Sequence, residues 1–346
     1  MRTSGKKYLR IPGILLLLFA FLPARPQPSV ATDSVVPRID SNYIADYTNL
    51  LTARLYLLDE NSSFVFIKEA NHQIVYKPNV NFRIGIAGFY KWFGLGVSVK
   101  SPLLERNTSK YGTTSSLDLR INAYGNQFAG ELFFQSYKGF YISTPVAEDG
   151  SFYKVPSMML WSAGATGYWI LNYHRFSIRA AFIQNERQKK SAGSLIISPF
   201  FYYYSIQSPG GILPQELIND YQIRNYEILT SGDFYAFGLA PGYTYSFIFL
   251  KYFYINAALS PGVYWQHASY NTLAAPNTTL DISFFLNGRL AAGYNNGKWF
   301  IGLSVITGFS DIPSLYAGSK FYYNVTQMRL WGGTRFDWFR KKSKKL

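Results

Sequence analysis

Residues 235–249 read YAFGLAPGYTYSFIF. The odd-numbered positions are aromatic, aliphatic or proline, and the even-numbered positions before Ile248 are Ala, Gly, Thr or Ser. Successive side chains of a β-strand point to opposite faces, so the pattern predicts a strand with one apolar face and one small, mildly polar face. No charge occurs between Gly238 and Leu250. Soluble sandwiches usually carry charges outward, so lipid outside and a lumen inside is the better interpretation.

The composition supports the same class of protein. Aromatic residues make up 18% of the 346 residues and charged residues only 15%, against about 25% in soluble domains. Mean hydropathy is −0.04, and no apolar run of 18 residues follows the N-terminal region, which disfavours a helical membrane protein. The chain contains no cysteine, which excludes a disulfide, a thiol nucleophile and a lipoprotein anchor.

The N-terminal residues resemble an export signal. Residues 1–31 combine a basic start with an apolar run of about 12 residues, too short to span a bilayer, and cleavage is expected after Ala24 or Ala31. We expect residues 32–50 to be a periplasmic lead-in, 51–339 a barrel and 340–346 a basic tail. The predicted location is the outer membrane of a Gram-negative cell.

The net charge of +15 is unevenly distributed. Five basic residues precede the predicted cleavage site and five more lie in the tail from Arg340 onward. Half of the excess that remains after cleavage is therefore one short segment, so the charge is weak support for nucleic-acid binding, and none is predicted.

Alternation continues through most of the chain and predicts an all-β, transmembrane, antiparallel up-and-down barrel of about 14 strands, with 12 as the alternative. Tight turns near residues 91, 125, 173, 250 and 296 are assigned to the periplasmic end, and Pro241 and Pro261 to bulges or the rim. The predicted strands are Leu51–Lys68, Ile74–Tyr90, Phe93–Lys100, Leu117–Tyr124, Phe128–Tyr137, Met158–Leu171, Phe176–Arg187, Leu195–Ile206, Tyr221–Leu229, Tyr235–Phe249, Tyr252–Gln266, Ile282–Asn295, Trp299–Phe309 and Phe321–Phe339.

Two sets of residues follow from this alternation. A cationic lumen would favour anions, whereas arginine–carboxylate pairs would plug the interior and hold the wall rigid. The lumen-facing candidates are Arg83, Lys100, Asp118, Arg120, Glu131, Arg179, Asp281 and Arg289. Aromatic residues near strand ends are typical of interfacial girdles, and an ordinary aromatic core is the alternative. The girdle candidates are Tyr90, Trp92, Trp169, Tyr173, Tyr252, Trp299 and Trp338.

Catalytic chemistry has little support in the sequence. The three histidines are His72, His174 and His267, and only His267, two residues before Ser269, suggests a hydrolase. No Gly-x-Ser-x-Gly elbow and no His-Glu-x-x-His motif is present. Dispersed histidines without cysteine also predict no metal site, and no cofactor is expected.

Several short motifs resemble one known family. The motifs are Tyr76-Lys-Pro-Asn79, Gly85 with Gly88 and Tyr90-Lys91, Lys138-Gly-Phe-Tyr141, Gln188-Lys-Lys-Ser-Ala-Gly-Ser194 and Gly242-Tyr-Thr-Tyr245. They are similar to an uncharacterised family of Bacteroidota-type outer-membrane proteins, a domain of unknown function with the number four-four-two-one. The resemblance covers roughly residues 40–340 and implies an outer-membrane β-barrel, but no activity or catalytic residue.

The sequence therefore predicts a non-enzymatic outer-membrane barrel, either a narrow pore or a structural or assembly component. Its expected partner is outer-membrane lipid, and protein partners in the periplasm or outer membrane stay open. One alternative is a barrel hydrolase acting on lipid or surface glycan. Another is a secreted soluble β-protein that binds an acidic polymer through its basic tail.

Overall fold

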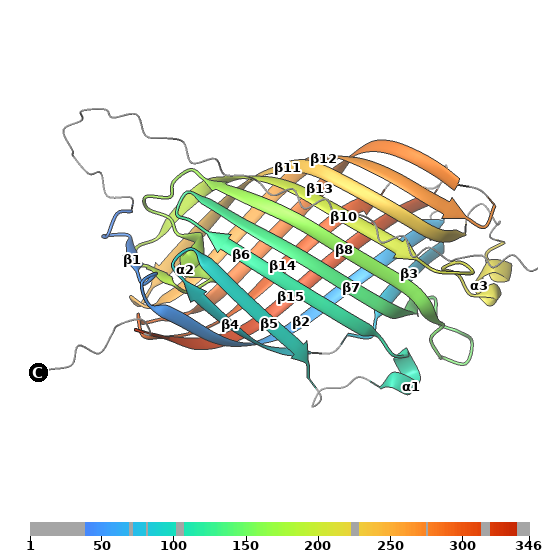
Figure 1. The fold of residues 1–346 in the computed structure, drawn as a ribbon, viewed down its shortest axis with the longest axis horizontal. Helices are drawn as coiled ribbons and strands as arrows, with labels where there is room; N and C mark the ends of the chain where they lie inside the picture. Colours follow the sequence, from blue (N-terminus) through green and yellow to red (C-terminus); the bar gives the residue numbers. More distant parts are fainter. Residues whose placement is uncertain are drawn as a thin grey trace, which may run out of the picture. The chain divides into compact units, whose positions relative to one another are not determined.

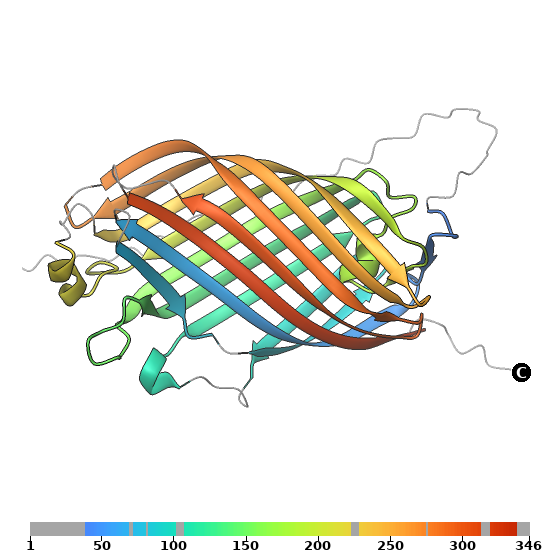
Figure 2. The same ribbon diagram turned by 180° about the vertical axis from the view of Figure 1, so that it is seen from behind.

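The computed structural model describes residues 39–68, 72–80, 82–101, 107–222, 228–274, 276–312 and 319–337. The predicted signal at 1–31, the girdle candidate Trp338 and the tail at 340–346 lie outside these residues. Most of the described chain is β-strand, and its strands are tilted across one another in a closed wall (Figures 1 and 2).

Within the described residues, thirteen strands form one antiparallel sheet. The sheet closes on itself because the first long strand pairs with the last, from Leu51 opposite Phe336 to Lys68 opposite Ser319. The prediction of an antiparallel up-and-down barrel is therefore confirmed. The strands are β2 (Leu51–Lys68), β3 (His72–Pro78), β4 (Arg83–Tyr90), β5 (Phe93–Lys100), β6 (Ser115–Tyr124), β7 (Phe128–Thr144), β8 (Lys154–Ile170), β10 (Ala192–Gln207), β11 (Leu229–Phe249), β12 (Phe253–Thr272), β13 (Pro276–Asn295), β14 (Trp299–Ile312) and β15 (Ser319–Phe336).

The ring contains different numbers of strands at its two ends. β3 and β4 replace the single predicted strand Ile74–Tyr90, and residues 79–82 separate them. Near the tight turns, β4, β5 and β6 lie between β2 and β7, so twelve of the described strands close the ring. At the other end β3 alone joins β2 to β7, and ten strands close it. The wider end agrees with the alternative count of twelve rather than with fourteen.

One of the fourteen predicted strands does not belong to the wall. Phe176–Arg187 instead forms α2 (Ile178–Phe182) and the start of β9 (Glu186–Gln188), which pairs with β1 (Ile44–Asp46). The Ser177 hydroxyl caps α2 by accepting from the Ala180 N–H at 3.0 Å. Every residue from Phe176 to Glu186 is buried, so this segment has no lipid-facing side on which alternation could act.

The predicted strand Tyr221–Leu229 falls largely outside the described residues. The helix α3 (Gln215–Asp220) ends just before it, and Tyr221 and Gln222 form a turn. Residues 223–227 lie outside the described part of the chain, and only Leu229 belongs to a strand, as the first residue of β11.

The two faces of the wall match the alternation from which the fold was predicted. In β11, Phe237 is 61% exposed on the outside, whereas Ala236 is 6% exposed on the inside. Apolar side chains of the neighbouring strands are exposed in the same way, and they form a belt around the barrel. Such a belt is costly in water and stable in lipid, because the closed ladder satisfies the backbone. No helix among the described residues is long and apolar enough to cross a membrane.

The small inner residues of β11 make room for aromatic rings inside the barrel. A Cβ atom on Gly238 would lie 2.6 Å from Cζ of Phe200 and 2.5 Å from Cβ of Tyr264. Pro241 and Pro261 face outward from β11 and β12, and the ladder between these strands is interrupted where they lie opposite one another. Each proline lacks an N–H, so the interruption leaves no donor unpaired at either residue.

Candidate functional site in the lumen

A segment from the tight-turn end lies inside the barrel and is hydrogen-bonded to its wall. We term residues 171–191, which connect β8 to β10 and include α2 and β9, the plug. α2 and β1 lie at the same end of the barrel, at the left of Figure 1. The Arg179 guanidinium of the plug donates to the Tyr124 carbonyl and, at 2.8 Å, to the Glu186 carboxylate. Burial raises the pKa of the Glu186 carboxyl, and Arg179 opposes this shift.

Gln184 is the most heavily bonded residue of the plug. Its side-chain N–H group donates to the Ala180 carbonyl at 2.8 Å and to the Tyr254 hydroxyl at 2.6 Å, and its side-chain oxygen accepts from Asn295 at 2.9 Å. Its backbone is left-handed, with φ of 71°, and its carbonyl accepts from Arg335 Nε at 2.7 Å. A strained, fully buried residue with this many partners fastens the plug to the wall.

Toward the opposite end, a second segment packs on the wall through apolar side chains. We term residues 208–222, which follow β10 and include α3, the cap. Ile212, Leu213 and Leu217 of the cap are buried in one cluster with Phe64 and Tyr76 of the wall. Among the described residues, the contacts between the cap and the wall in this cluster are apolar.

Between the plug and the cap, a first polar network surrounds Glu60. Its carboxylate accepts from Gln135 at 2.7 Å, from the Tyr137 hydroxyl at 2.6 Å and from Gln327 at 2.7 Å. Arg120 Nη2 lies 3.2 Å from the same carboxylate. These donors hold the Glu60 carboxylate in one position between β2, β7 and β15.

Asp118 extends this network toward β4. The Arg120 Nε atom lies 3.0 Å from one Asp118 carboxylate oxygen, and Arg83 Nη1 lies 3.1 Å from the other. Arg83 also donates to the Ser116 hydroxyl at 2.9 Å. These contacts tie β4 to β6 beneath β5, which lies between them.

A second polar network surrounds Glu131. Its carboxylate accepts from the hydroxyls of Tyr124 and Tyr168, and both Arg289 terminal nitrogens lie 3.3 Å from it. The Arg289 guanidinium also lies over the ring of Phe182 in the plug, 6.0 Å from its centroid. The network thus connects the wall to the plug as well as one side of the wall to the other.

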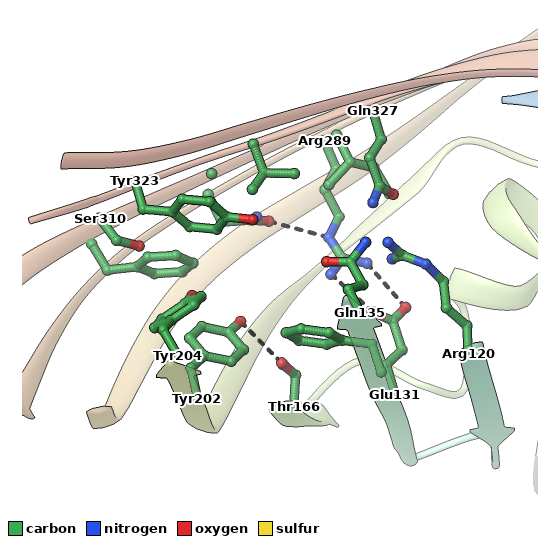
Figure 3. A pocket seen from close by; sticks show the side chains of 16 residues that line it. Arg120, Glu131, Gln135, Thr166, Tyr202, Tyr204, Arg289, Ser310, Tyr323 and Gln327 are labelled. Atoms are coloured by element: carbon green, nitrogen blue, oxygen red, sulfur yellow. Dashed lines mark hydrogen bonds and ion pairs between the residues drawn. The ribbon is translucent and has the colours of Figure 1, made fainter. Parts of the chain in front are cut away.

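Three cavities remain around these networks, with volumes of about 130, 80 and 40 Å³. Figure 3 shows the largest, where Arg120, Glu131 and Arg289 converge from one side and the rings of Tyr202 and Tyr204 from the other. Arg120 and Glu131 also line the second cavity. The lumen therefore contains small chambers lined by both polar and apolar side chains, each large enough for several water molecules.

The structure brings together five of the eight predicted lumen residues, namely Arg83, Asp118, Arg120, Glu131 and Arg289, in the two networks. Arg179 is buried in the plug rather than on a wall strand, because its segment is not a strand of the barrel. Asp281 is exposed, and its carboxylate accepts from the Ile282 N–H at 2.8 Å. The side chain of Lys100 lies outside the described part of the structure.

On the inner face of the described wall strands, sequence reasoning missed four charged residues. Arg54 and Glu60 lie on β2, and Arg329 and Arg335 lie on β15. Their positions alternate with lipid-facing residues, so the same parity would have identified them.

The aromatic candidates divide by position. Trp92, Trp169 and Trp299 are exposed near the tight-turn end of the wall, whereas Tyr90 and Tyr252 are half-buried there. Tyr173 belongs instead to the plug and packs on His174, with ring centroids 4.0 Å apart.

Neither a metal site nor a catalytic pair emerges from the described residues. No group of three metal-ligating side chains occurs among them. His267 lies on the outer face, with its ring 6.5 Å from that of Trp265 and 6.4 Å from that of Tyr235. This environment is an aromatic surface rather than a cleft.

Comparison with known proteins assigns the chain to a family but not to a function. No curated protein matches the chain significantly. Similar solved structures include the outer-membrane protease OmpT from Escherichia coli, at 9% identity over 84% of this chain and 98% of that one, with a TM-score of 0.39. The translocator domain of the autotransporter NalP from Neisseria meningitidis is also 9% identical, over 86% and 90%, with a TM-score of 0.33. The P. putida toluene transporter TodX is 7% identical, over 83% and 89%, with a TM-score of 0.26.

A family model matches residues 38–336, which include the whole barrel. The expected resemblance is confirmed, and the chain belongs to the DUF4421 family, a domain of unknown function.

Proposed function

We propose that this protein is a non-enzymatic outer-membrane barrel that is closed at rest and serves as a structural or assembly component rather than as an open pore. The observation that carries the proposal is the plug, which is bonded to the wall through Gln184, Arg179 and Arg335. Outer-membrane lipid is its proposed surrounding, because the exposed apolar belt needs hydrocarbon around it. An export signal at residues 1–31 would deliver it there.

The closure has three layers. The plug fills one end of the barrel, the cap fills the other, and the Glu60 and Glu131 networks cross the middle. Water-filled porins keep a continuous path, whereas small barrels are filled by their own side chains. This arrangement favours a rigid wall over permeation, and it disfavours the soluble alternative because the apolar residues face outward.

Planar bilayer recording tests the closed state. The purified full-length protein should insert without producing steady conductance steps. A variant in which short Gly-Ser links replace both the plug and the cap should conduct, provided that it folds as judged by heat-modifiable migration on gels. A matched control replaces the exposed loop 146–151 in the same way and should remain silent. Steady steps from the unmodified protein would favour the narrow-pore alternative.

The hydrolase alternative depends on His267 and Ser269. Both lie on the outer face of β12, and no hydrogen bond joins them among the described contacts. We expect His267→Ala to leave any lipase or glycosidase activity of the purified protein unchanged. A loss of such activity in this variant, with folding intact, would argue for the enzyme instead.

A further inference from the structure

The barrel wall is weakly paired at one place. β5 and β6 pair only between Phe93–Gly96 and Arg120–Ala123. Beyond this point β5 continues as Val97–Lys100 and β6 as Ser115–Leu119, without a ladder pair between these described residues. Over the same length, β5 remains paired with β4 on its other edge, and β6 remains paired with β7. We term this gap in the ladder the seam.

The two sides of the seam differ in character. On the outside, Val97, Val99, Leu117 and Leu119 are exposed apolar side chains of the membrane belt. On the inside, Arg83 crosses from β4 to Asp118 and Ser116, as described above. The seam is therefore held by side chains rather than by backbone bonds, so it can part without loss of ladder hydrogen bonds.

A cavity lies directly behind the seam. Its volume is about 80 Å³, and its lining includes Ser98 of β5 and Asp118 of β6, one residue from each seam strand. Arg54 and Arg329 line the same cavity. One water molecule needs about 10–15 Å³ by this measure, so the cavity has room for a carboxylate or a group of similar size.

Arg54 and Arg329 lack a carboxylate partner among the described ion pairs. Arg54 is only 6% exposed; it donates to the Phe182 carbonyl at 2.7 Å and stacks on Phe89, 4.8 Å from its ring centroid. Arg329 lies over the ring of Tyr56, at 5.2 Å. The Nε atoms of both arginines are buried without a hydrogen-bond acceptor. Arg329 is half-buried and lies within electrostatic range of Asp118 and Glu131, whereas Arg54 is a buried cation with no carboxylate near it among the described residues. A buried cation without a counter-charge is costly, and an anion in this cavity would remove that cost for Arg54.

We propose that this cavity binds the anionic head of a single-chain amphiphile such as a fatty acid, which reaches it from the bilayer through the seam. The carboxylate accepts hydrogen bonds from Arg54 and Arg329, and the acyl chain lies between the apolar side chains of β5 and β6. The site does not require a closed plug, so a conducting barrel would leave this proposal standing.

Binding is tested on the full-length protein in nanodiscs with a fluorescent fatty acid as the probe. We expect saturable binding that Arg54→Gln and Arg329→Gln each weaken at least tenfold, while Arg329→Lys retains most of it. Arg175→Gln, at an exposed arginine of the plug, is the matched control and should have no effect. The uncharged alcohol of the same chain length should bind much more weakly than the acid. Equal affinity in the wild type and the glutamine variants would overturn the site.

The route is tested by linking the seam. The chain has no cysteine, so Val97→Cys with Leu119→Cys can be joined by a short bis-maleimide without competing thiols. The control pair, Leu95→Cys with Ile121→Cys, joins residues that the ladder already places opposite one another. We expect the seam link to slow fatty-acid uptake at least tenfold and the control link to leave it unchanged. Uptake that is unaffected by the seam link would refute the lateral route.

A soluble anion could supply the same negative group to this cavity without an acyl chain. Acetate and inorganic phosphate are added as competitors at millimolar concentration. Weak or absent competition supports an amphiphile, whose chain contributes to binding. Displacement of the probe by either ion at the probe's own affinity would show that the cavity takes a soluble anion, and would overturn the proposal.

Discussion

Glu131 illustrates how a charge is held inside a barrel wall. Two tyrosine hydroxyls and one guanidinium surround it, so the ionised carboxylate has donors on several sides. A buried pair of this kind contributes modestly to stability as a whole, but the loss of one partner leaves the other charge uncompensated.

Glu131→Leu should therefore destabilise the fold by about 3–5 kcal/mol, because Arg289 remains in the lumen without its anion. The double variant Glu131→Leu/Arg289→Leu should be less destabilised than Glu131→Leu alone. Unfolding in guanidinium, followed by tryptophan fluorescence in micelles, provides the double-mutant cycle. Additive effects of the two substitutions would mean that the pair is not coupled.

Gln184 is the residue through which the plug is most directly attached. Gln184→Ala removes the side-chain bonds to Ala180, Tyr254 and Asn295, and we expect a loss of about 2–4 kcal/mol from the partners left unsatisfied. Gln207→Ala, at an exposed position of β10, is the matched control and should change stability by less than about 0.5 kcal/mol. Midpoints of guanidinium unfolding measure the stability of both variants. Similar midpoints for Gln184→Ala and Gln207→Ala would show that Gln184 does not hold the plug.

At the scale of the elements, the break between β3 and β4 determines where the ring changes from ten strands to twelve. Asn79 in the break is held by the segment that directly precedes β6. Its N–H donates to the Thr114 hydroxyl at 2.7 Å, and its side chain donates to the Gly112 carbonyl at 2.7 Å. Thr114 in turn donates to the Gly139 carbonyl at 2.7 Å, so one hydroxyl connects the break to β7.

Thr114→Val retains the shape of this side chain but removes the hydroxyl. The Asn79 N–H and the Gly139 carbonyl then lose their partner, and the expected cost is about 2–4 kcal/mol. Thr113→Val changes the exposed neighbour and should be nearly neutral. Thermal unfolding monitored by circular dichroism compares the two variants, and equal melting temperatures would contradict this role of Thr114.

At the scale of the whole molecule, the barrel is apolar outside and charged inside. The outer belt requires hydrocarbon, and the inner networks require the protection of a closed wall. Both requirements are met by the same alternation of side chains along each strand.

The belt can be tested with one charge. Leu259, 57% exposed and in the middle of β12, should lie near the bilayer midplane. Leu259→Arg should destabilise the folded barrel by about 2–4 kcal/mol. Leu273→Arg makes the same change just beyond the end of β12 and should cost about 1 kcal/mol or less. Refolding yield into vesicles measures both, and equal tolerance at the two positions would exclude a lipid-facing belt at Leu259.

Much of the wall could be predicted from local pattern. The alternation in residues 235–249 correctly assigned the outward and inward faces of β11, and parity placed Arg120, Glu131 and Arg289 in the lumen. A period of two needs no knowledge of distant contacts, because it follows from the geometry of a single strand. The same reasoning failed for Phe176–Arg187, because that segment is buried on all sides and no longer alternates between lipid and lumen.

Tertiary structure alone determined how the inward residues meet. Glu60 and Gln327 are 267 positions apart in the chain, and only the closure of β2 on β15 brings their side chains within 2.7 Å. The plug, the change from twelve strands to ten and the seam likewise depend on strand register and on long-range packing. Local alternation specifies the face of the wall on which a side chain lies, whereas its partner depends on how the whole ring closes.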